Sequence, residues 1–124
     1  MKPEDLSSAM DFELLMERLG GDTELARELA DLYLVEYPKQ LADLQSAVRA
    51  GDLKRVQQAA HKIKGTARNF AAAPAEECAR ALEESKEFGD GAAIAEITNR
   101  LSDELQLLQA ALEQALARKT GGIS

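Results

Sequence analysis

Apolar residues recur every three or four positions in two long stretches of the chain, and this pattern limits the possible folds strongly. The first stretch spans residues 53–70 and the second spans residues 94–116. Their apolar members are Leu53, Val56, Ala60, Ile63, Ala67 and Phe70, followed by Ile94, Ile97, Leu101, Leu105, Leu108, Leu112 and Leu116. This spacing puts each set on one face of a helix that turns about 100° per residue. Both stretches therefore predict amphipathic helices with a buried apolar face.

Glycine and aspartate residues mark the boundaries of further helices. We expect a short helix at about residues 11–18, ended by a glycine pair, and a longer one that follows. Asp22 and Asp52 are each expected to cap the helix after them. The residues expected to point inward on the longer helix are Leu25, Leu29, Leu32, Leu41, Leu44 and Val48. Pro38 lies within this helix, so we expect a kink near residues 34–38, with a full break as the alternative.

The chain after residue 70 predicts a helical hairpin and completes a bundle. Pro74 suits the first turn of a helix that would run antiparallel to the 53–70 helix. The predicted fold is all-α, an antiparallel up-down four-helix bundle with a short additional N-terminal helix. We expect the bundle to span residues 11–118, with flexible segments at residues 1–10 and 119–124.

Composition excludes several classes of function. The net charge of −7 argues against a nucleic-acid partner, although residues 52–70 hold five basic side chains against Asp52 alone. The single cysteine, Cys78, excludes an internal disulfide and falls on an apolar stripe, so we interpret it as a core residue. No apolar run is long enough for a signal sequence or membrane span, which predicts a cytoplasmic protein with no membrane contact. A fragment of a larger membrane-bound kinase remains the alternative.

His61 is the only histidine in the sequence, and it lies on the polar side of the 53–70 helix. It is roughly 130° from the centre of the apolar face on a helical wheel, so we expect it to face solvent or a partner. A neutral imidazole nitrogen can attack a phosphoryl group. Lys64, one turn later, can place an ammonium group beside the resulting anion. Gly65 costs a helix about 1 kcal/mol relative to alanine, which indicates that another backbone or domain comes close there.

Hairpin geometry suggests a neighbour for the histidine. The predicted hairpin turns near residue 72, and both His61 and Glu83 are eleven residues from that point. They should therefore lie at similar heights, where Glu83 could orient the ring or raise its basicity. Arg80, one turn earlier, is a weaker candidate.

The residues around the histidine match a known signature, and they read His61-Lys62-Ile63-Lys64-Gly65-Thr66-Ala67. The run resembles the His-x-x-Lys-Gly-small-small signature of histidine-containing phosphotransfer (HPt) domains of bacterial phosphorelays. The likeness covers about residues 10–117 and includes the flanking segments Leu14–Asp22, Gly51–Asp52 and Cys78–Glu83. It implies that His61 is phosphorylated, that Lys64 lies near the phosphoryl group and that Gly65 leaves room for a docking receiver domain. Many family members have glycine where this chain has Ala71.

The resemblance implies a phosphorelay intermediate. His61 would accept a phosphoryl group from a receiver-domain aspartate, or from a sensor histidine kinase, and pass it to another receiver aspartate. The residues expected on the receiver-docking face are Gln57, Gln58, Lys62, Gly65 and Arg68. Mg²⁺ would come with the receiver, and we expect no bound cofactor or metal on this chain, because a bundle metal site needs several inward ligands.

The chain is expected to be a monomeric phosphoryl carrier and not an autonomous enzyme, because it has no nucleotide-binding motif for kinase activity. The alternative is a helical interaction module that binds a receiver or kinase without carrying phosphate. Such a module would not need His61 and Lys64 together.

Overall fold

The chain is all-α, as the sequence predicts, throughout the part that the structure describes. The structure is a computed structural model and describes residues 8–120. Its helices are α2 (Phe12–Arg18), α3 (Thr23–Ala50), α4 (Leu53–Asn69), α5 (Ala73–Glu83) and α6 (Ala92–Thr120). No strand occurs among the described residues, and no helix there is long and apolar enough to cross a membrane.

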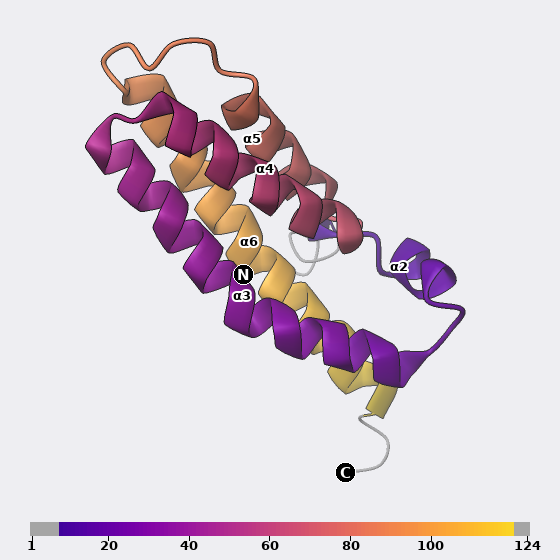
Figure 1. Cartoon of the computed structure of the whole chain (residues 1–124). Coiled ribbons are helices and arrows are strands. Elements are labelled where there is room, and N and C mark those ends of the chain that lie inside the picture. The colour runs from indigo at the N-terminus through magenta and orange to yellow at the C-terminus, as the bar shows by residue number, and fades with distance from the viewer. Residues whose placement is uncertain (1–7, 121–124) are drawn as a thin grey trace.

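The four longer helices form an antiparallel up-down bundle, and the short α2 lies beside one end of it (Figure 1). Both α3 and α5 pack against α4 and α6, so the order around the bundle is α3, α4, α5, α6. The outer side between α4 and α5 is therefore opposite the outer side between α3 and α6. α3 and α6 are also the longest helices, and they extend beyond α4 and α5 at the end of the bundle near α2 (Figure 1).

Aspartate caps set the starts of α3 and α4, as predicted. The Asp22 carboxylate accepts a hydrogen bond from the backbone N–H of Leu25 at 3.0 Å, and Asp52 accepts one from Arg55 at 3.2 Å. Gly51 ends α3 with a φ of 66°, a left-handed conformation that glycine adopts without steric cost. The connection between these helices is therefore short, which makes them antiparallel neighbours.

α3 continues through Pro38 without interruption, so the alternative of a full break is wrong. Figure 1 shows the axis of α3 changing direction about midway along the helix, as expected of a kink. Proline removes one backbone hydrogen bond and crowds the preceding turn. The buried side chains of Tyr37 and Leu41 hold the helix to the core on both sides of this position.

The inward face of the first half of α3 differs from the sequence prediction. Leu25 and Leu32 are 37% and 59% exposed, so the expectation that they point inward is wrong. Tyr33 and Tyr37 enter the core instead, with stacked rings whose centroids are 4.6 Å apart. The Tyr33 hydroxyl donates a hydrogen bond to the Leu105 carbonyl at 2.7 Å. The Tyr37 hydroxyl donates a hydrogen bond to the Gln109 side chain at 2.5 Å. Because both hydroxyls are satisfied, the two rings can be buried while the two leucines lie outside.

The rest of the predicted core is confirmed. Leu41 and Leu44 are buried, and the buried residues of the last stripe are Ile94, Leu101, Leu105, Leu108, Leu112 and Leu116. Leu29, Val48 and Ile97 pack against the edge of this core.

The ends of the chain were expected to be flexible. α6 runs to Thr120, two residues past the expected end of the bundle, and Ala9 and Met10 of the N-terminal segment are buried in the core. Residues 1–7 and 121–124 lie outside the described part of the chain.

Candidate functional site

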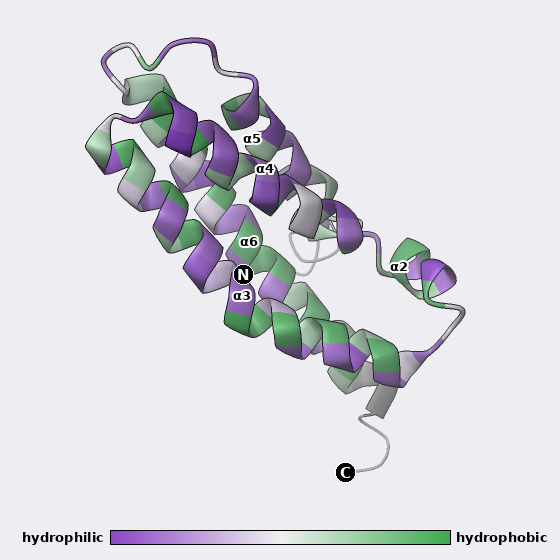
Figure 2. Ribbon diagram, viewed as in Figure 1, coloured by the Kyte–Doolittle hydropathy of each residue, from purple (hydrophilic) through white to green (hydrophobic). Residues whose placement is uncertain are grey.

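α4 presents His61 on its outer face, where 69% of the side chain is exposed. The opposite face is apolar and buried, as the spacing predicts, through Val56, Ala60, Ile63 and Ala67. Figure 2 shows the resulting hydrophilic outer surface of α4. Burial of one face thus fixes the direction in which the histidine points.

Glu83, at the end of α5, joins His61 to Lys64. One carboxylate oxygen of Glu83 is hydrogen-bonded to Nδ1 of His61, and the other accepts a hydrogen bond from the Lys64 ammonium group. The structure therefore places the predicted neighbour beside the histidine, at the same height in the α4–α5 hairpin. Arg80, the weaker candidate, pairs with glutamates on α5 instead.

The charge on Glu83 determines which nitrogen of His61 is available. Hydrogen bonds from Lys64, and secondarily from His61, lower the pKa of Glu83 below its ordinary value, so this side chain is a carboxylate at neutral pH. A carboxylate only accepts hydrogen bonds, so Nδ1 carries the proton of the neutral ring. Nε2 then holds the free lone pair, and it makes no hydrogen bond with the residues that the structure describes.

A shallow depression surrounds the histidine and includes most of the expected docking residues. It is lined by Gln57, Gln58, His61, Lys62 and Glu83. The Gln57 amide donates a hydrogen bond to the Ser85 carbonyl at 2.6 Å, which fixes the side of the depression nearest the α5–α6 loop. Gly65 is exposed on α4, and a Cβ built there would meet no atom within 4 Å. A docking partner therefore meets open space at this glycine.

Arg68 is the one expected docking residue that the structure does not bring to His61. It lies seven residues further along α4, about 10 Å at 1.5 Å per residue. Its guanidinium pairs with Glu76 at 3.0 Å, and its carbonyl accepts a hydrogen bond from Arg18 at 2.9 Å. Arg68 therefore links α4 to α5 and to α2. Its partners on other helices, which a helical wheel does not show, hold it there.

A second hollow, between α3 and α4, was missed from the sequence. It is lined by Leu19, Leu29, Leu32, Tyr33, Glu36, Gln40, Thr66, Asn69 and Phe70. The Thr66 hydroxyl donates a hydrogen bond to the Gln40 side chain at 3.1 Å, which spans the two helices. Figure 2 shows apolar residues on the outer surface of the first half of α3. The available signal was Leu32, an apolar residue that lies out of helical phase with Tyr33 and Tyr37.

The remaining reactive side chain, Cys78, is buried in the core as predicted. Burial raises the pKa of its thiol, which makes it a poor nucleophile. Among the described residues, no group of three or more His, Cys, Asp or Glu side chains is arranged to hold a metal ion. His61 is thus the exposed nucleophile that this fold presents beside a cation.

Comparison with known families agrees with this geometry, because the model of the Hpt domain matches residues 28–118. The chain belongs to the Hpt domain family. No curated protein and no solved structure gives a match. The matched region of this Hpt domain contains His61, Lys64, Gly65 and Glu83. Hpt domains carry phosphoryl groups in phosphorelays, so the chain has a role in histidine phosphotransfer, with receiver domains and kinases of two-component systems as its partners.

Proposed function

We propose that this Hpt domain is a phosphorelay intermediate that accepts a phosphoryl group on Nε2 of His61 from a receiver-domain aspartate or a kinase. It then passes the group to the aspartate of another receiver domain in the cytoplasm. The observation that carries this proposal is the bond between Glu83 and Nδ1, which leaves Nε2 unprotonated on an exposed ring.

The transfer step conserves charge and atoms. The lone pair on Nε2 attacks the phosphorus of the aspartyl phosphate and forms an N–P bond. The P–O bond to the aspartate breaks, and the aspartate leaves as a carboxylate. The ring of His61 becomes an imidazolium that keeps its proton on Nδ1, and the Glu83 carboxylate stabilises this positive charge. Transfer to the next aspartate returns the ring to its neutral form.

Lys64 supplies positive charge next to the reacting group. Its ammonium is already held beside His61 by the Glu83 carboxylate, and only 18% of its side chain is exposed. Because it lies one turn from His61, it can also donate a hydrogen bond to the phosphoryl oxygens. Most of the remaining negative charge on the phosphoryl group would be neutralised by Mg²⁺ bound to the receiver. A carboxylate cluster on the receiver is the usual type of site for this ion.

The receiver would dock over the exposed face of α4. Gln58 and Lys62 border the depression around His61, and Gly65 leaves the surface open. The hollow between α3 and α4 extends this face and adds apolar area at Leu32. A surface with an apolar part and a polar rim suits a transient protein partner.

Phosphate labelling tests the proposal directly. Incubation with a phosphorylated receiver should give an acid-labile, base-stable label, as expected of a phosphoramidate, and His61→Gln should abolish it. Asp103→Asn, an exposed change on α6, serves as the matched control and should keep the label. Circular dichroism must show that all variants are folded.

Two results would contradict the proposal. A label that persists in folded His61→Gln would show that another residue carries the phosphate. A wild-type chain that binds the receiver but takes no label from any phosphorylated receiver or kinase would be an interaction module instead.

A further inference from the structure

A groove on the side of the bundle opposite His61 has no assigned role. It lies between the first half of α3 and the second half of α6, and its volume is 260 Å³. It is lined by Arg27, Ala30, Asp31, Leu34, Gln109, Leu112, Glu113, Leu116 and Ala117. Since α3 and α6 face away from the α4–α5 side, the groove and His61 are on different faces of the molecule.

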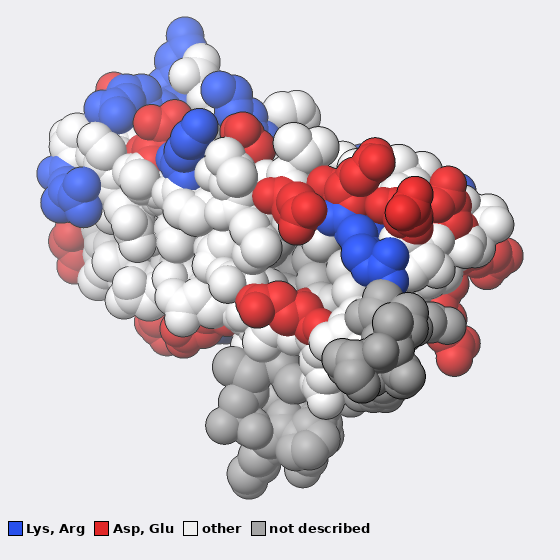
Figure 3. All heavy atoms as spheres, turned by 90° about the horizontal axis from the view of Figure 1, so that it is seen from below, with Lys and Arg blue, Asp and Glu red and all other residues white. Residues whose placement is uncertain are grey.

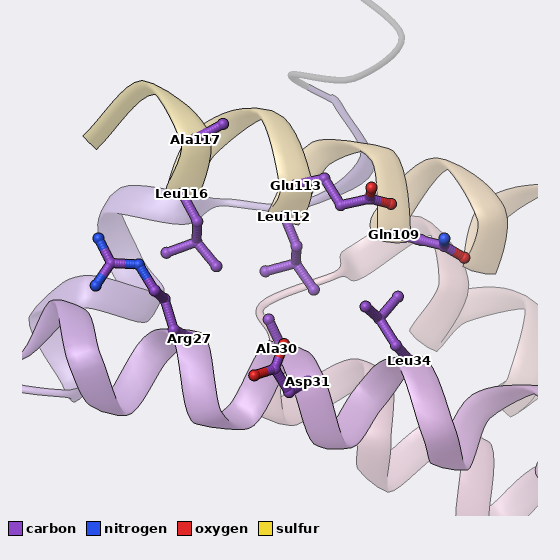
Figure 4. A pocket seen from close by; sticks show the side chains of 9 residues that line it. All are labelled: Arg27, Ala30, Asp31, Leu34, Gln109, Leu112, Glu113, Leu116 and Ala117. Carbon is purple, nitrogen blue, oxygen red and sulfur yellow. The ribbon is translucent and has the colours of Figure 1, made fainter. Parts of the chain in front are cut away.

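The groove has an apolar floor, with Arg27 toward one end, Glu113 toward the other and the Asp31 carboxylate beside Ala30 between them (Figure 4). Arg27 lies beside Leu116 near one end, and Glu113 extends toward Gln109 near the other. Neither Arg27 nor Glu113 has a hydrogen bond or ion pair with the residues that the structure describes.

Exposed apolar side chains continue the groove onto the outer face of α3. Leu34 is 37% exposed and Val35 is 54% exposed. Exposed aliphatic side chains beside a groove are typical of a surface that another protein covers. The unpaired charges at its ends then decide which partner fits.

A surface with opposite charges at its two ends is complementary to itself. A two-fold axis that passes through the middle of the groove, perpendicular to its length and in the plane of the interface, would relate the two copies. Their ends are then exchanged, so Arg27 of each copy would face Glu113 of the other. We propose that a second copy of this chain docks on the α3–α6 groove and forms a symmetric dimer. The dimer contains two such pairs, with the exposed aliphatic side chains and Asp31 of both copies between them. The monomer expected from the sequence is the alternative that the experiment below tests.

Dimerisation through this groove leaves the phosphotransfer face free. His61 lies on the α4–α5 side, which is opposite the groove in the order of the helices. Each copy would therefore keep its own accessible histidine, and the dimer would carry two independent phosphoryl groups. The proposal does not depend on phosphate transfer, so it can be tested on the unphosphorylated protein.

Sedimentation equilibrium over a range of concentrations measures the association. The average mass of the wild type should rise toward twice that of the chain at physiological ionic strength, where screening limits repulsion between chains of charge −7. Arg27→Glu alone and Glu113→Arg alone should each weaken the dimer by about tenfold or more, because like charges would then face each other twice.

Charge exchange provides the sharper test. The double variant Arg27→Glu/Glu113→Arg should regain the dimer, because the exchange restores both pairs. An equimolar mixture of the two single variants should form heterodimers for the same reason. Leu34→Asn should also weaken association, whereas Leu32→Asn, an equally conservative change at a more exposed leucine outside the groove, should not.

Several results would overturn the proposal. A wild type that stays monomeric at every concentration excludes the dimer. If the wild type is monomeric but a chain ending at Thr120 dimerises, residues 121–124 occupy the groove instead. If Leu32→Asn weakens the dimer and Leu34→Asn does not, or if the charge exchange fails to restore association, the interface lies elsewhere.

Discussion

Glu83 has two partners at the level of single residues, and each partner has a different part in the chemistry. Its bond to Nδ1 of His61 determines the tautomer, and its bond to the Lys64 ammonium holds a cation near the nitrogen that we propose to react. A phosphoryl group on His61 would attract the same ammonium. We therefore interpret Glu83 as a positioning residue. It orients the His61 ring and the Lys64 ammonium but does not touch the phosphate.

Replacement of Glu83 by glutamine should slow transfer by about tenfold, because the imidazolium formed during the reaction loses its ionised partner. Stopped-flow or quench-flow measurement of label transfer gives the rate. Nitrogen NMR of Glu83→Ala should show less of the Nδ1–H tautomer than the wild type, which a purely structural role would not change. Glu84→Gln, at the next and exposed position, is the control. Equal rates for Glu83→Gln and wild type would remove Glu83 from the mechanism.

The lowered pKa of Glu83 also makes the free energy of unfolding depend on pH in the acid range. Because the pKa of Glu83 is lower in the folded state, its bonds stabilise the fold above the ordinary glutamate pKa of about 4.3. This contribution is lost as the pH falls through the lower, folded value. The difference in free energy of unfolding between wild type and Glu83→Gln should therefore shrink on acidification, as measured by urea titration at several pH values.

Ala71 is strained. It has a φ of 53°, the left-handed conformation that costs residues other than glycine about 1–2 kcal/mol. Ala71→Gly should raise the free energy of unfolding by up to about 1 kcal/mol, because the greater freedom of unfolded glycine offsets part of the relief. Ala73→Gly, in the adjacent first turn of α5, should destabilise the fold instead. Thermal and urea unfolding of both variants test this pair, and equal effects would show that the backbone at Ala71 is not strained.

At the level of helices, α4 and α5 pack together, and both carry small side chains on their buried faces. Ala60 and Ala67 on α4 and Ala75 and Ala79 on α5 are all at most 1% exposed. Alanines at an interface allow two helices to approach closely, because no long side chain separates them. This packing places the Glu83 side chain of α5 within hydrogen-bonding reach of His61 and Lys64 on α4.

Gly65 has opposite effects on the free helix and on docking. Gly65→Ala should stabilise the domain by up to about 1 kcal/mol, since the new Cβ meets no atom within 4 Å. Gly65→Gln should weaken receiver binding and slow transfer without unfolding the protein, because its side chain would project into the docking surface. Ala81→Gln on the exposed side of α5 adds similar bulk away from His61. Thermal unfolding and receiver affinity measured on the same variants separate the two effects. If Gly65→Gln binds the receiver as the wild type does, the receiver does not dock over this part of α4.

At the level of the whole molecule, the bundle separates its surfaces. Figure 3 shows most basic side chains gathered toward one end of that view and acidic ones predominating at the other. The α4–α5 side presents the histidine, and the α3–α6 side presents the groove. Because α3 borders both the docking hollow and the groove, it connects the two proposed interfaces. One helical bundle therefore presents two different surfaces around a single core.

Much of the fold and the centre of the site could be predicted from sequence because they depend on neighbours within one or two helical turns. The 53–70 helix, its outward His61 and the caps at Asp22 and Asp52 were all predicted in this way, as was the stripe of the last helix. The helical hairpin even predicted the height of Glu83, because its two arms have equal rise per residue.

Only the tertiary structure decided which competing side chains enter the core and which ions pair. Tyr33 displaces the neighbouring leucines because its hydroxyl finds the Leu105 carbonyl, 72 residues away. Arg68 is held by Glu76 on another helix, away from the histidine. Periodicity alone does not reveal such bonds. Hydrophobicity predicts that a leucine is buried in preference to a tyrosine, because burial of an unpaired hydroxyl costs free energy, and this cost disappears only when a distant acceptor bonds the hydroxyl. The sequence by itself determined the helices and the face of α4 that carries His61, and packing between distant helices determined the rest.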